Sequence, residues 1–294
     1  EVWHKDVKFY KITNKSDKLI GYFYLDLYAR KSKRGGAWMD EAISKYKFPN
    51  EHTSPVAYLT CNFSEPVHNN VSLLTHDEVI TLFHEFGHGL HHLLTEINDY
   101  GVSGIQGVEW DAVELPSQFM ENFCWEWSVI KNMTEHTKTK KPMPKILFNK
   151  LLKSKNFQSG MQTTRQVEFA LFDIKLHSDY DPSLKNFLNL LNQVRDQVSV
   201  VRPPEWNRFP HSFSHIFAGG YAAGYYSYKW AEVLSADAYS LFEEMGILSD
   251  EAGKKFRKEI LSMGGSRPAM NSFVKFRGRK PSIDALLRHN GLLS

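Results

Sequence analysis

The sequence has little cysteine: Cys61 and Cys124 are the two cysteines among 294 residues. Each lies in an apolar or aromatic neighbourhood, and neither belongs to a C-x-x-C pair, so a cysteine metal site is not expected. We predict two buried thiols rather than a disulfide, which is typical of a reducing compartment. The cytoplasm is therefore the favoured location, with an organelle matrix as the alternative.

Long apolar runs and an excess of one charge are also lacking. No stretch is long and apolar enough to span a bilayer, so we expect no membrane interaction. Lysine and arginine number 36 and aspartate and glutamate 33, and the net charge of +3 is too small to indicate nucleic-acid binding. Two short basic clusters, residues 31–34 and 277–280, are predicted to be solvated faces.

The sequence also shows no initiator methionine and no signal segment, since it opens at Glu1 on what resembles mid-domain sequence. We therefore expect a fragment of a longer protein. Its composition is globular, with 42% hydrophobic and 23% charged residues. A chain of this length can bury a substantial core, and we expect one compact, monomeric unit.

Residue patterns predict a mainly α-helical fold with a small N-terminal β-sheet. Aromatic and β-branched residues, separated by turn residues, predict strands over residues 7–12, 20–28 and 55–63. These strands define a small β-rich part at residues 1–70. Helical periodicity dominates the remaining part, residues 71–294.

The helical part is divided by glycine and proline. Helices are predicted over residues 75–95, 111–129, 145–156, 162–177, 184–198, 222–245, 249–263 and 282–289. The glycine-rich residues 101–107 are predicted to form a mobile loop. Residues 209–220 are predicted to form an active-site loop.

The segment His84-Glu85-Phe-Gly-His88 carries the strongest chemical signal. Residues four apart share a helix face, so both imidazoles can converge on one metal ion with Zn–N bonds of about 2.0–2.1 Å. Glu85 is offset around the helix and can address zinc-bound water without being a ligand. This is the arrangement of H-E-x-x-H metallopeptidases. It predicts one Zn²⁺ ion held by His84 and His88, with Glu85 as the general base.

A catalytic zinc site needs a third protein ligand and one open position. Glu114 is the candidate, because the stretch between it and His88 is long enough for a loop and a returning helix. Glu121 lies seven residues further on the same helix face, where it could orient a ligand imidazole or be an ordinary helix-surface or salt-bridged side chain. His92 lies one turn from His88, but no glutamate follows His88 to act as the base. His91 and His92 are therefore predicted to be accessory or structural.

Several stretches around the metal motif form one extended pattern. They are Phe83-His-Glu-Phe-Gly-His-Gly-Leu-His-His92, Gly101-Val-Ser-Gly104, Trp110-Asp-Ala-Val-Glu-Leu-Pro-Ser-Gln-Phe-Met-Glu-Asn122, Gly21-Tyr-Phe-Tyr-Leu-Asp-Leu-Tyr-Ala-Arg30, Lys33-Arg-Gly-Gly-Ala-Trp38 and Ser214-His-Ile-Phe-Ala-Gly-Gly-Tyr-Ala-Ala-Gly-Tyr-Tyr-Ser-Tyr228. With these stretches the chain resembles the thimet oligopeptidase/neurolysin family of zinc metallopeptidases. The similarity is greatest to the C-terminal catalytic portion of its oligopeptidase A branch.

The resemblance implies a fold, an activity and a set of site residues. It implies a zincin-like catalytic domain over residues 1–294, acting as an oligopeptidase on short peptides in peptide catabolism, without the helical N-terminal half of family members. By matched position, the zinc ligands would be His84, His88 and Glu114, with Glu85 as base. The family's transition-state contacts fall on His215, Tyr221 and Tyr228, and a substrate contact falls on Tyr225.

Peptide hydrolysis also needs hydrogen-bond donors for the oxyanion besides zinc. Phenols and imidazoles supply them, which favours Tyr228 and His215. Gly219 and Gly220 would let this segment bend close to a substrate backbone. The alternative is that Tyr225, Tyr226 and Tyr228 begin a helix and only pack in the core, which is what we predict for Tyr226.

A rival function stays open. The chain could be an inactive fragment that binds peptide and zinc, because the N-terminal wall of the family's substrate channel is missing.

Overall fold

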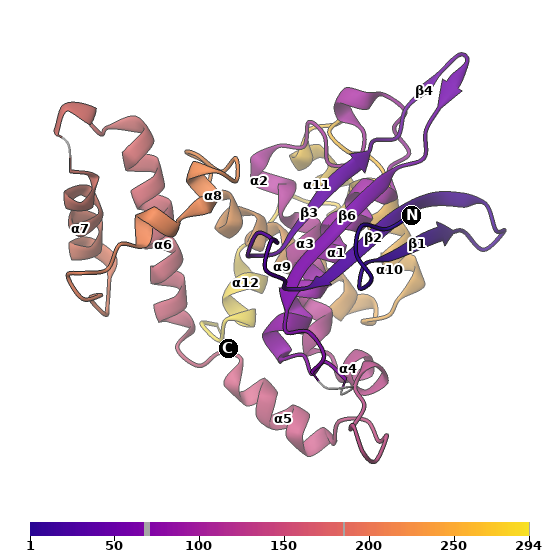
Figure 1. The fold of residues 1–294 in the computed structure, drawn as a ribbon, viewed down its shortest axis with the longest axis horizontal. Coiled ribbons are helices and arrows are strands. Elements are labelled where there is room, and N and C mark those ends of the chain that lie inside the picture. Colours follow the sequence, from indigo (N-terminus) through magenta and orange to yellow (C-terminus); the bar gives the residue numbers. More distant parts are fainter. Residues whose placement is uncertain (68–70, 185, 294) are drawn as a thin grey trace.

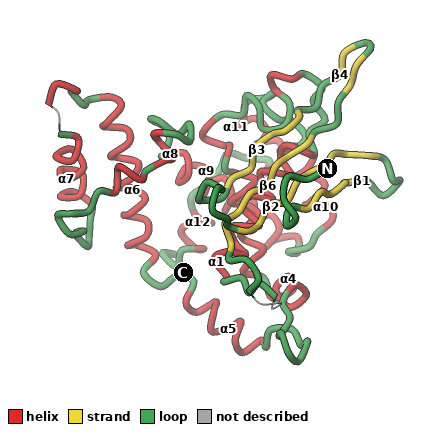
Figure 2. Tube along the Cα trace, in the orientation of Figure 1, coloured by secondary structure: helices red, strands yellow, loops and turns green. Residues whose placement is uncertain are grey.

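The computed structural model describes residues 1–67, 71–184 and 186–293, and within these ranges all strands precede all longer helices (Figures 1 and 2). The strands are β1 (Lys8–Thr13), β2 (Leu19–Tyr28), β3 (Trp38–Ile43), β4 (Lys47–Phe48), β5 (Glu51–His52) and β6 (Val56–Phe63). The helices are α1 (His76–Leu93), α2 (Trp110–Val113), α3 (Leu115–Glu121), α4 (Trp127–Met133), α5 (Lys145–Ser154), α6 (Ser159–Ser178), α7 (Phe187–Val198), α8 (Ser214–Phe217), α9 (Ser227–Met245), α10 (Asp250–Phe256), α11 (Ala269–Arg277) and α12 (Asp284–His289). Single turns of 3-10 or π-helix lie at Tyr100–Val102, Asn122–Trp125, Pro182–Leu184, Phe209–Ser212 and Arg257–Leu261. The prediction of a mainly helical chain with a small N-terminal sheet is confirmed.

The main sheet has four strands in the order β1-β2-β6-β3. β1 pairs antiparallel with β2, β2 runs parallel to β6, and β3 pairs antiparallel with β6. The central strand β6 is apolar and buried over most of its length, as expected for a strand with neighbours on both sides. β4 and β5 form a separate two-stranded hairpin.

Helix α1 lies against one face of this sheet (Figure 1). The contact is close: a Cβ atom at Gly89 would lie 3.0 Å from Leu59 Cδ2 on β6. A buried cluster fills the interface, formed by Phe23, Ala57, Leu59 and Leu93. The sheet therefore supports the helix that carries the H-E-x-x-H motif.

A second core holds the central helices together. Phe119 of α3 stacks on Phe256 at the end of α10, with ring centroids 4.0 Å apart, and α9 packs across α3. A third cluster joins the α6–α7 pair, at the left of Figure 1, to the segment that precedes α9. Its buried members are Phe172, Leu191, Phe213, Ile216 and Tyr225.

The three predicted strands are confirmed as β1, β2 and β6, but β3 was not predicted. β3 carries Asp40 and Glu41 and shows no alternation of buried and exposed residues. It is a terminal strand of the sheet, a place where acidic side chains reach solvent at little cost. Its sequence therefore lacks the apolar signal that identifies a central strand.

The single helix predicted over residues 111–129 is wrong. Four short helical segments replace it, and the first break falls at Glu114, between α2 and α3. Pro116 has no amide hydrogen, so it cannot continue the hydrogen-bond ladder of α2. It serves instead in the first turn of α3, where that hydrogen is not needed.

Several other helix bounds also differ from the prediction. The helix predicted over residues 222–245 begins at Ser227, and the one over 249–263 ends its α-helical part at Phe256 before a π-helical turn. Helix α11, between Pro268 and Gly278, was not predicted. Part of the start predicted for the helix over 184–198, and the predicted boundary between parts at residue 70, lie outside the described residues.

The prediction that the two basic clusters are solvated faces is wrong at their key residues. Lys33 and Arg30 both bind the carboxylate of Asp26, which is 4% exposed, at distances of 2.7–2.9 Å. Arg277 likewise binds the buried Asp237, 3.2 Å away. Each cluster therefore supplies a cation that offsets the charge of a buried carboxylate, Asp26 in one case and Asp237 in the other.

The remaining expectations concern the cysteines, the glycine-rich loop and the membrane. Cys61 and Cys124 are both free and buried, as predicted, and burial raises the pKa of each thiol to about 12. The loop at 101–107 is held by contacts: Ser103 is fully buried, and the carbonyl of Val102 accepts the Gly265 amide at 3.0 Å. Among the described residues, no helix combines the length and apolarity needed to cross a bilayer.

Candidate metal centre

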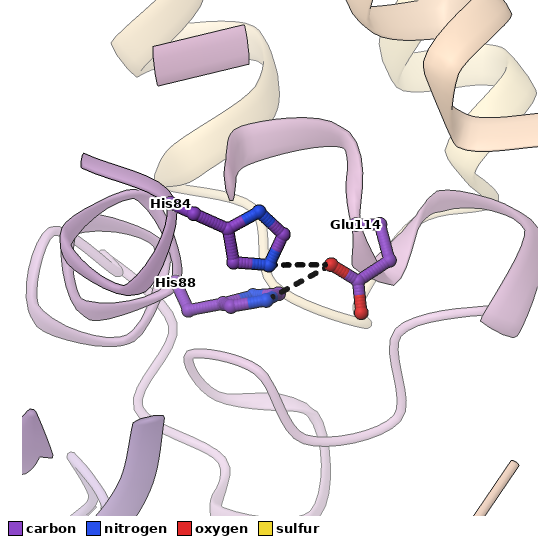
Figure 3. A group of neighbouring side chains, drawn as sticks. All are labelled: His84, His88 and Glu114. Carbon is purple, nitrogen blue, oxygen red and sulfur yellow. Dashed lines mark ion pairs between the residues drawn. The ribbon is translucent and has the colours of Figure 1, made fainter. Parts of the chain in front are cut away.

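Helix α1 presents the two predicted histidine ligands on one face. It starts at a capping box, in which Thr75 accepts the amide of Glu78 and the Glu78 side chain accepts the Thr75 amide. His84 and His88 follow one turn apart, with ring centroids 5.0 Å from each other. The helix is thereby fixed in register, and both imidazoles point toward the break between α2 and α3 (Figure 3).

Glu114 meets both imidazoles from that break. Its Oε2 atom lies 3.2 Å from Nε2 of His84 and 3.0 Å from Nε2 of His88 (Figure 3). Ser117 Oγ, 2.9 Å away, donates to the same carboxylate oxygen and holds it in place. Glu114 is 1% exposed, so these contacts are shielded from bulk water. Glu114 therefore lies close to both histidines, at a helix end rather than on a helix face, and its role as the third ligand stays a prediction.

This donor set fits zinc. With bonds of about 2.0–2.1 Å, two ligand atoms on a zinc tetrahedron lie about 3.3 Å apart. The two nitrogen–oxygen separations match that spacing, and all three ligand atoms lie within 4.8 Å of one another. Two imidazole nitrogens and one carboxylate oxygen leave a fourth position open, which is typical of catalytic rather than structural zinc.

Charge in this cluster is balanced between the imidazoles and the carboxylates. Burial raises the pKa of Glu114, but the neighbouring His88 and His84 outweigh it and hold that pKa well below its usual range. Burial likewise lowers the pKa of His84, and its contacts with Glu114 and Glu121 raise it by more. The carboxylate is thus ionised and suited to a cation.

Glu121 contacts the far side of one ligand imidazole. Its Oε1 lies 2.6 Å from Nδ1 of His84. An imidazole that donates Nδ1–H to a carboxylate presents its Nε2 lone pair to a metal. Of the two interpretations left open for Glu121, the geometry favours orientation of the ligand. His91 and His92 are buried and do not belong to the cluster of ligand atoms, and His92 Nε2 lies 3.0 Å from the Ile43 carbonyl oxygen.

Glu85 lies beside the metal cluster on the same helix and is 5% exposed. It lines a cavity of 870 Å³ together with His84, His88, Glu114, His215, Tyr221 and Tyr228. Burial raises the pKa of the Glu85 carboxyl, while the nearby His84 and His88 lower it. A carboxylate with a raised pKa beside an open metal position is suited to accept a proton.

Three predicted residues of the later segment reach this cavity. The Tyr221 hydroxyl donates to Oε1 of Glu114, and its ring stacks on Tyr228 with centroids 4.9 Å apart. The His215 ring centroid lies 5.9 Å from that of Tyr228. Burial and the Glu114 charge raise the pKa of both phenols, so they stay protonated and can donate. Burial lowers the pKa of His215 and favours its neutral form.

The predicted glycines allow the segment its sharp turn. A Cβ atom at Gly219 would lie 2.9 Å from the His215 carbonyl oxygen. Gly220 has φ +85°, a left-handed conformation that residues with a side chain rarely adopt. Gly219 lines the cavity, whereas Gly220 faces the ring of Trp110, 3.6 Å from its Cβ position.

The structure places Tyr225 and Tyr226 differently from each other. Tyr225 is 8% exposed, donates its hydroxyl to Gln166 at 3.0 Å, and has a pKa raised by burial to about 12. It lines a second cavity that adjoins Tyr228 and His215. The prediction that Tyr226 is core is wrong: it is 36% exposed and donates to Asp111 at 2.7 Å.

Sequence reasoning missed two residues that shape the centre. Ser117 fixes the Glu114 carboxylate, and Gly87 lets α3 approach α1, since a Cβ there would lie 2.5 Å from Ser117 Cα. Both could have been identified from the sequence, because Gly87 lies between the two motif histidines and Ser117 follows Glu114 by three residues.

Comparisons with known proteins identify the family of this chain. The family model described as peptidase family M3 matches residues 1–292. The chain is 57% identical to oligopeptidase A of Haemophilus influenzae over 100% of its own length and 44% of that relative. It is 55% identical to oligopeptidase A of Escherichia coli over 99% of its length and 43% of the relative. The chain therefore spans less than half the length of these relatives.

Solved structures share the fold at low sequence identity. A structure titled PZ peptidase A with an inhibitor matches 91% of this chain and 42% of its own with a TM-score of 0.63, at 17% identity. A carboxypeptidase of Pyrococcus furiosus matches 92% of this chain and 53% of its own, with a TM-score of 0.57 at 16% identity. The resemblance inferred from the motifs is confirmed by the match of the family model to nearly every residue. The chain belongs to peptidase family M3.

Proposed function

We propose that this chain is the catalytic part of a zinc-dependent peptidase that hydrolyses short oligopeptides. The observation that carries the proposal is the convergence of His84, His88 and Glu114, with Glu85 beside them, on one cavity. When bound, zinc supplies Lewis-acid polarisation of a peptide carbonyl and of water. Oligopeptides are the substrate class indicated by the names of the relatives.

Glu85 acts as the general base and then as the acid. It removes a proton from the attacking water and delivers it to the departing amide nitrogen. Its buried position, with a raised pKa, supports transfer in both directions.

The phenols and the imidazole act on the oxyanion. Tyr228 and His215 donate hydrogen bonds to the oxygen that gains charge during attack. Tyr221 donates to Glu114 in this structure and so also holds a metal ligand. Because burial keeps both phenols protonated, no rearrangement of protons is needed when the charge develops.

Strand β3 offers a binding edge for the substrate backbone. It pairs with β6 through one edge and ends the sheet at the other. Residues 36–40 line the cavity that contains the metal cluster. An extended peptide added to this edge as a further strand lies across the centre, and its main chain rather than its side chains supplies most hydrogen bonds.

The experiment is cleavage of a quenched-fluorescent peptide by the zinc-loaded chain, with and without chelator, together with E85Q. We expect cleavage that chelator abolishes, and an E85Q variant that binds zinc at one equivalent but is inactive. One equivalent of zinc without chelator-sensitive cleavage supports the inactive peptide-binding fragment, the rival suggested by the partial length. E85Q with unaltered activity removes Glu85 from the role of base.

A further inference from the structure

The segment between α8 and α9, residues 218–226, which we call the tyrosine loop, is held in an unusual backbone conformation. Gly220 has φ +85° and Ala223 has φ +55°. A non-glycine residue in the left-handed region costs free energy, so surrounding contacts must hold it there. The loop carries Tyr221 and leads directly into Tyr228, so its conformation decides where both phenols lie.

One buried carboxylate supplies these contacts. Asp173 lies in α6 and is 0% exposed. Its Oδ1 accepts the backbone amide of Ala223 and its Oδ2 accepts that of Tyr225, each at 2.9 Å. The donors lie 50 and 52 residues away in the chain, so this is a tertiary link. A carboxylate has two acceptor oxygens, so a single side chain can hold both amides at once.

A second contact on the same helix fixes the loop at another point. Gln166 lies seven residues before Asp173, two turns along the same face of α6. Its side-chain oxygen accepts the Tyr225 hydroxyl at 3.0 Å. Tyr225 is therefore held at its backbone by Asp173 and at the tip of its side chain by Gln166.

The held loop reaches the metal cluster through aromatic contacts. The ring of Tyr225 lies 5.0 Å from that of Tyr228, which stacks on Tyr221. The Tyr221 hydroxyl in turn donates to Glu114. Asp173 thus connects α6 to a metal ligand without lining the cavity itself.

We infer that Asp173 is a positioning residue, which anchors the tyrosine loop to α6 and so sets Tyr221 and Tyr228 at the metal centre. The inference rests on the proposed function for its catalytic consequence. It assigns a purpose to a buried acidic side chain that the chemistry of hydrolysis does not use.

The direct test is amide hydrogen exchange in D173N, with E168Q as the matched control. Asparagine replaces one acceptor oxygen by an NH₂ group, which cannot accept a backbone amide. Glu168 is a buried carboxylate of the same helix, but it binds Arg195, Arg165 and Ser199 rather than the loop.

In D173N one of the two acceptor oxygens is lost, so we expect at least one of the Ala223 and Tyr225 amides to exchange about 10- to 100-fold faster, the range for a lost hydrogen bond to a charged group. Amides of α1 should be unchanged in D173N, and the loop unchanged in E168Q. A folded D173N with normal loop exchange overturns the inference. If D173N loses protection in α1 as well, Q166L decides: faster exchange confined to the loop supports the anchor, and unchanged exchange overturns it.

The kinetic test separates positioning from general stability. We expect kcat of D173N to fall about 10- to 100-fold, as for a misplaced catalytic group, with KM changed little and zinc content retained. Equal losses of kcat in D173N and E168Q overturn the inference. Lack of activity in the unsubstituted chain instead contradicts the proposed function, and the exchange measurement then decides by itself whether Asp173 positions the loop.

Discussion

Gly87 of α1 lies directly against Pro116 of α3: a Cβ atom at position 87 would lie 2.4 Å from the Pro116 carbonyl oxygen. No real Cβ atom tolerates that distance from backbone. The two helices therefore approach as closely as they do only because residue 87 is glycine. This approach brings Glu114, two residues before Pro116, within reach of both imidazoles.

Substitution of Gly87 should damage the metal centre. In G87A, α3 must move away from α1, which we expect to lower the free energy of unfolding by about 1–3 kcal/mol and to weaken zinc binding. Chemical denaturation and competitive zinc titration measure the two effects. G253A is the control, because nothing lies within 4 Å of a Cβ at this helical glycine; it should be neutral or stabilise by up to about 1 kcal/mol. Unchanged zinc affinity in G87A would contradict this account of the helix contact.

Removal of the Glu121 side chain should weaken zinc binding without removing a ligand. The carboxylate lies 2.6 Å from Nδ1 of His84, so E121A frees that imidazole to rotate. We expect zinc affinity about 10- to 100-fold lower, measured by competition with a chromophoric chelator. E121Q keeps an acceptor oxygen and should lie between E121A and the unsubstituted chain. Equal zinc affinity in all three proteins would show that Glu121 is an ordinary helix-surface residue.

Removal of the Tyr228 hydroxyl should lower the rate of peptide cleavage. Loss of one oxyanion donor typically reduces kcat about 100- to 1,000-fold, and we expect Y228F to fall in that range. Y226F is the matched control, because Tyr226 is two residues away but donates to Asp111 instead. Steady-state kinetics on a fluorogenic peptide compare them. A loss below about tenfold in Y228F removes Tyr228 from this role.

The buried Asp26 should make the fold sensitive to acid. Burial raises the pKa of its carboxyl, but Arg30 and Lys33 outweigh burial and lower that pKa to about 2. A carboxyl with a depressed folded-state pKa contributes stability that is complete above about pH 4 and is lost as pH falls toward 2. The contribution is about 2 kcal/mol.

Urea denaturation between pH 5 and 2, at about half-unit intervals, measures this contribution. D26N should be less stable at pH 5 and should lose less stability across the interval. D179N, at an exposed position, should follow the unsubstituted chain. Parallel curves for D26N and the unsubstituted chain would contradict the assignment.

The part of this protein that sequence determined by itself is local. The four-residue spacing of His84 and His88 places them on one face of any helix, and the helix predicted from residue 75 does begin there, with Thr75 as its N-cap. Apolar and aromatic runs likewise identified β1, β2 and β6. Each of these features depends only on the backbone geometry of a single helix or strand, and that geometry is the same in every protein.

Tertiary structure alone decided the rest. Glu114 was found from sequence as a candidate, but its place at a helix end follows from Pro116 and from the missing side chain of Gly87. The burial of Lys33 follows from Asp26, and the shape of the tyrosine loop from Asp173 in a distant helix. A buried charge or a left-handed residue is stable only with a partner, and the partner is brought near by the fold. No local pattern contains that information, because it depends on which distant segments come into contact.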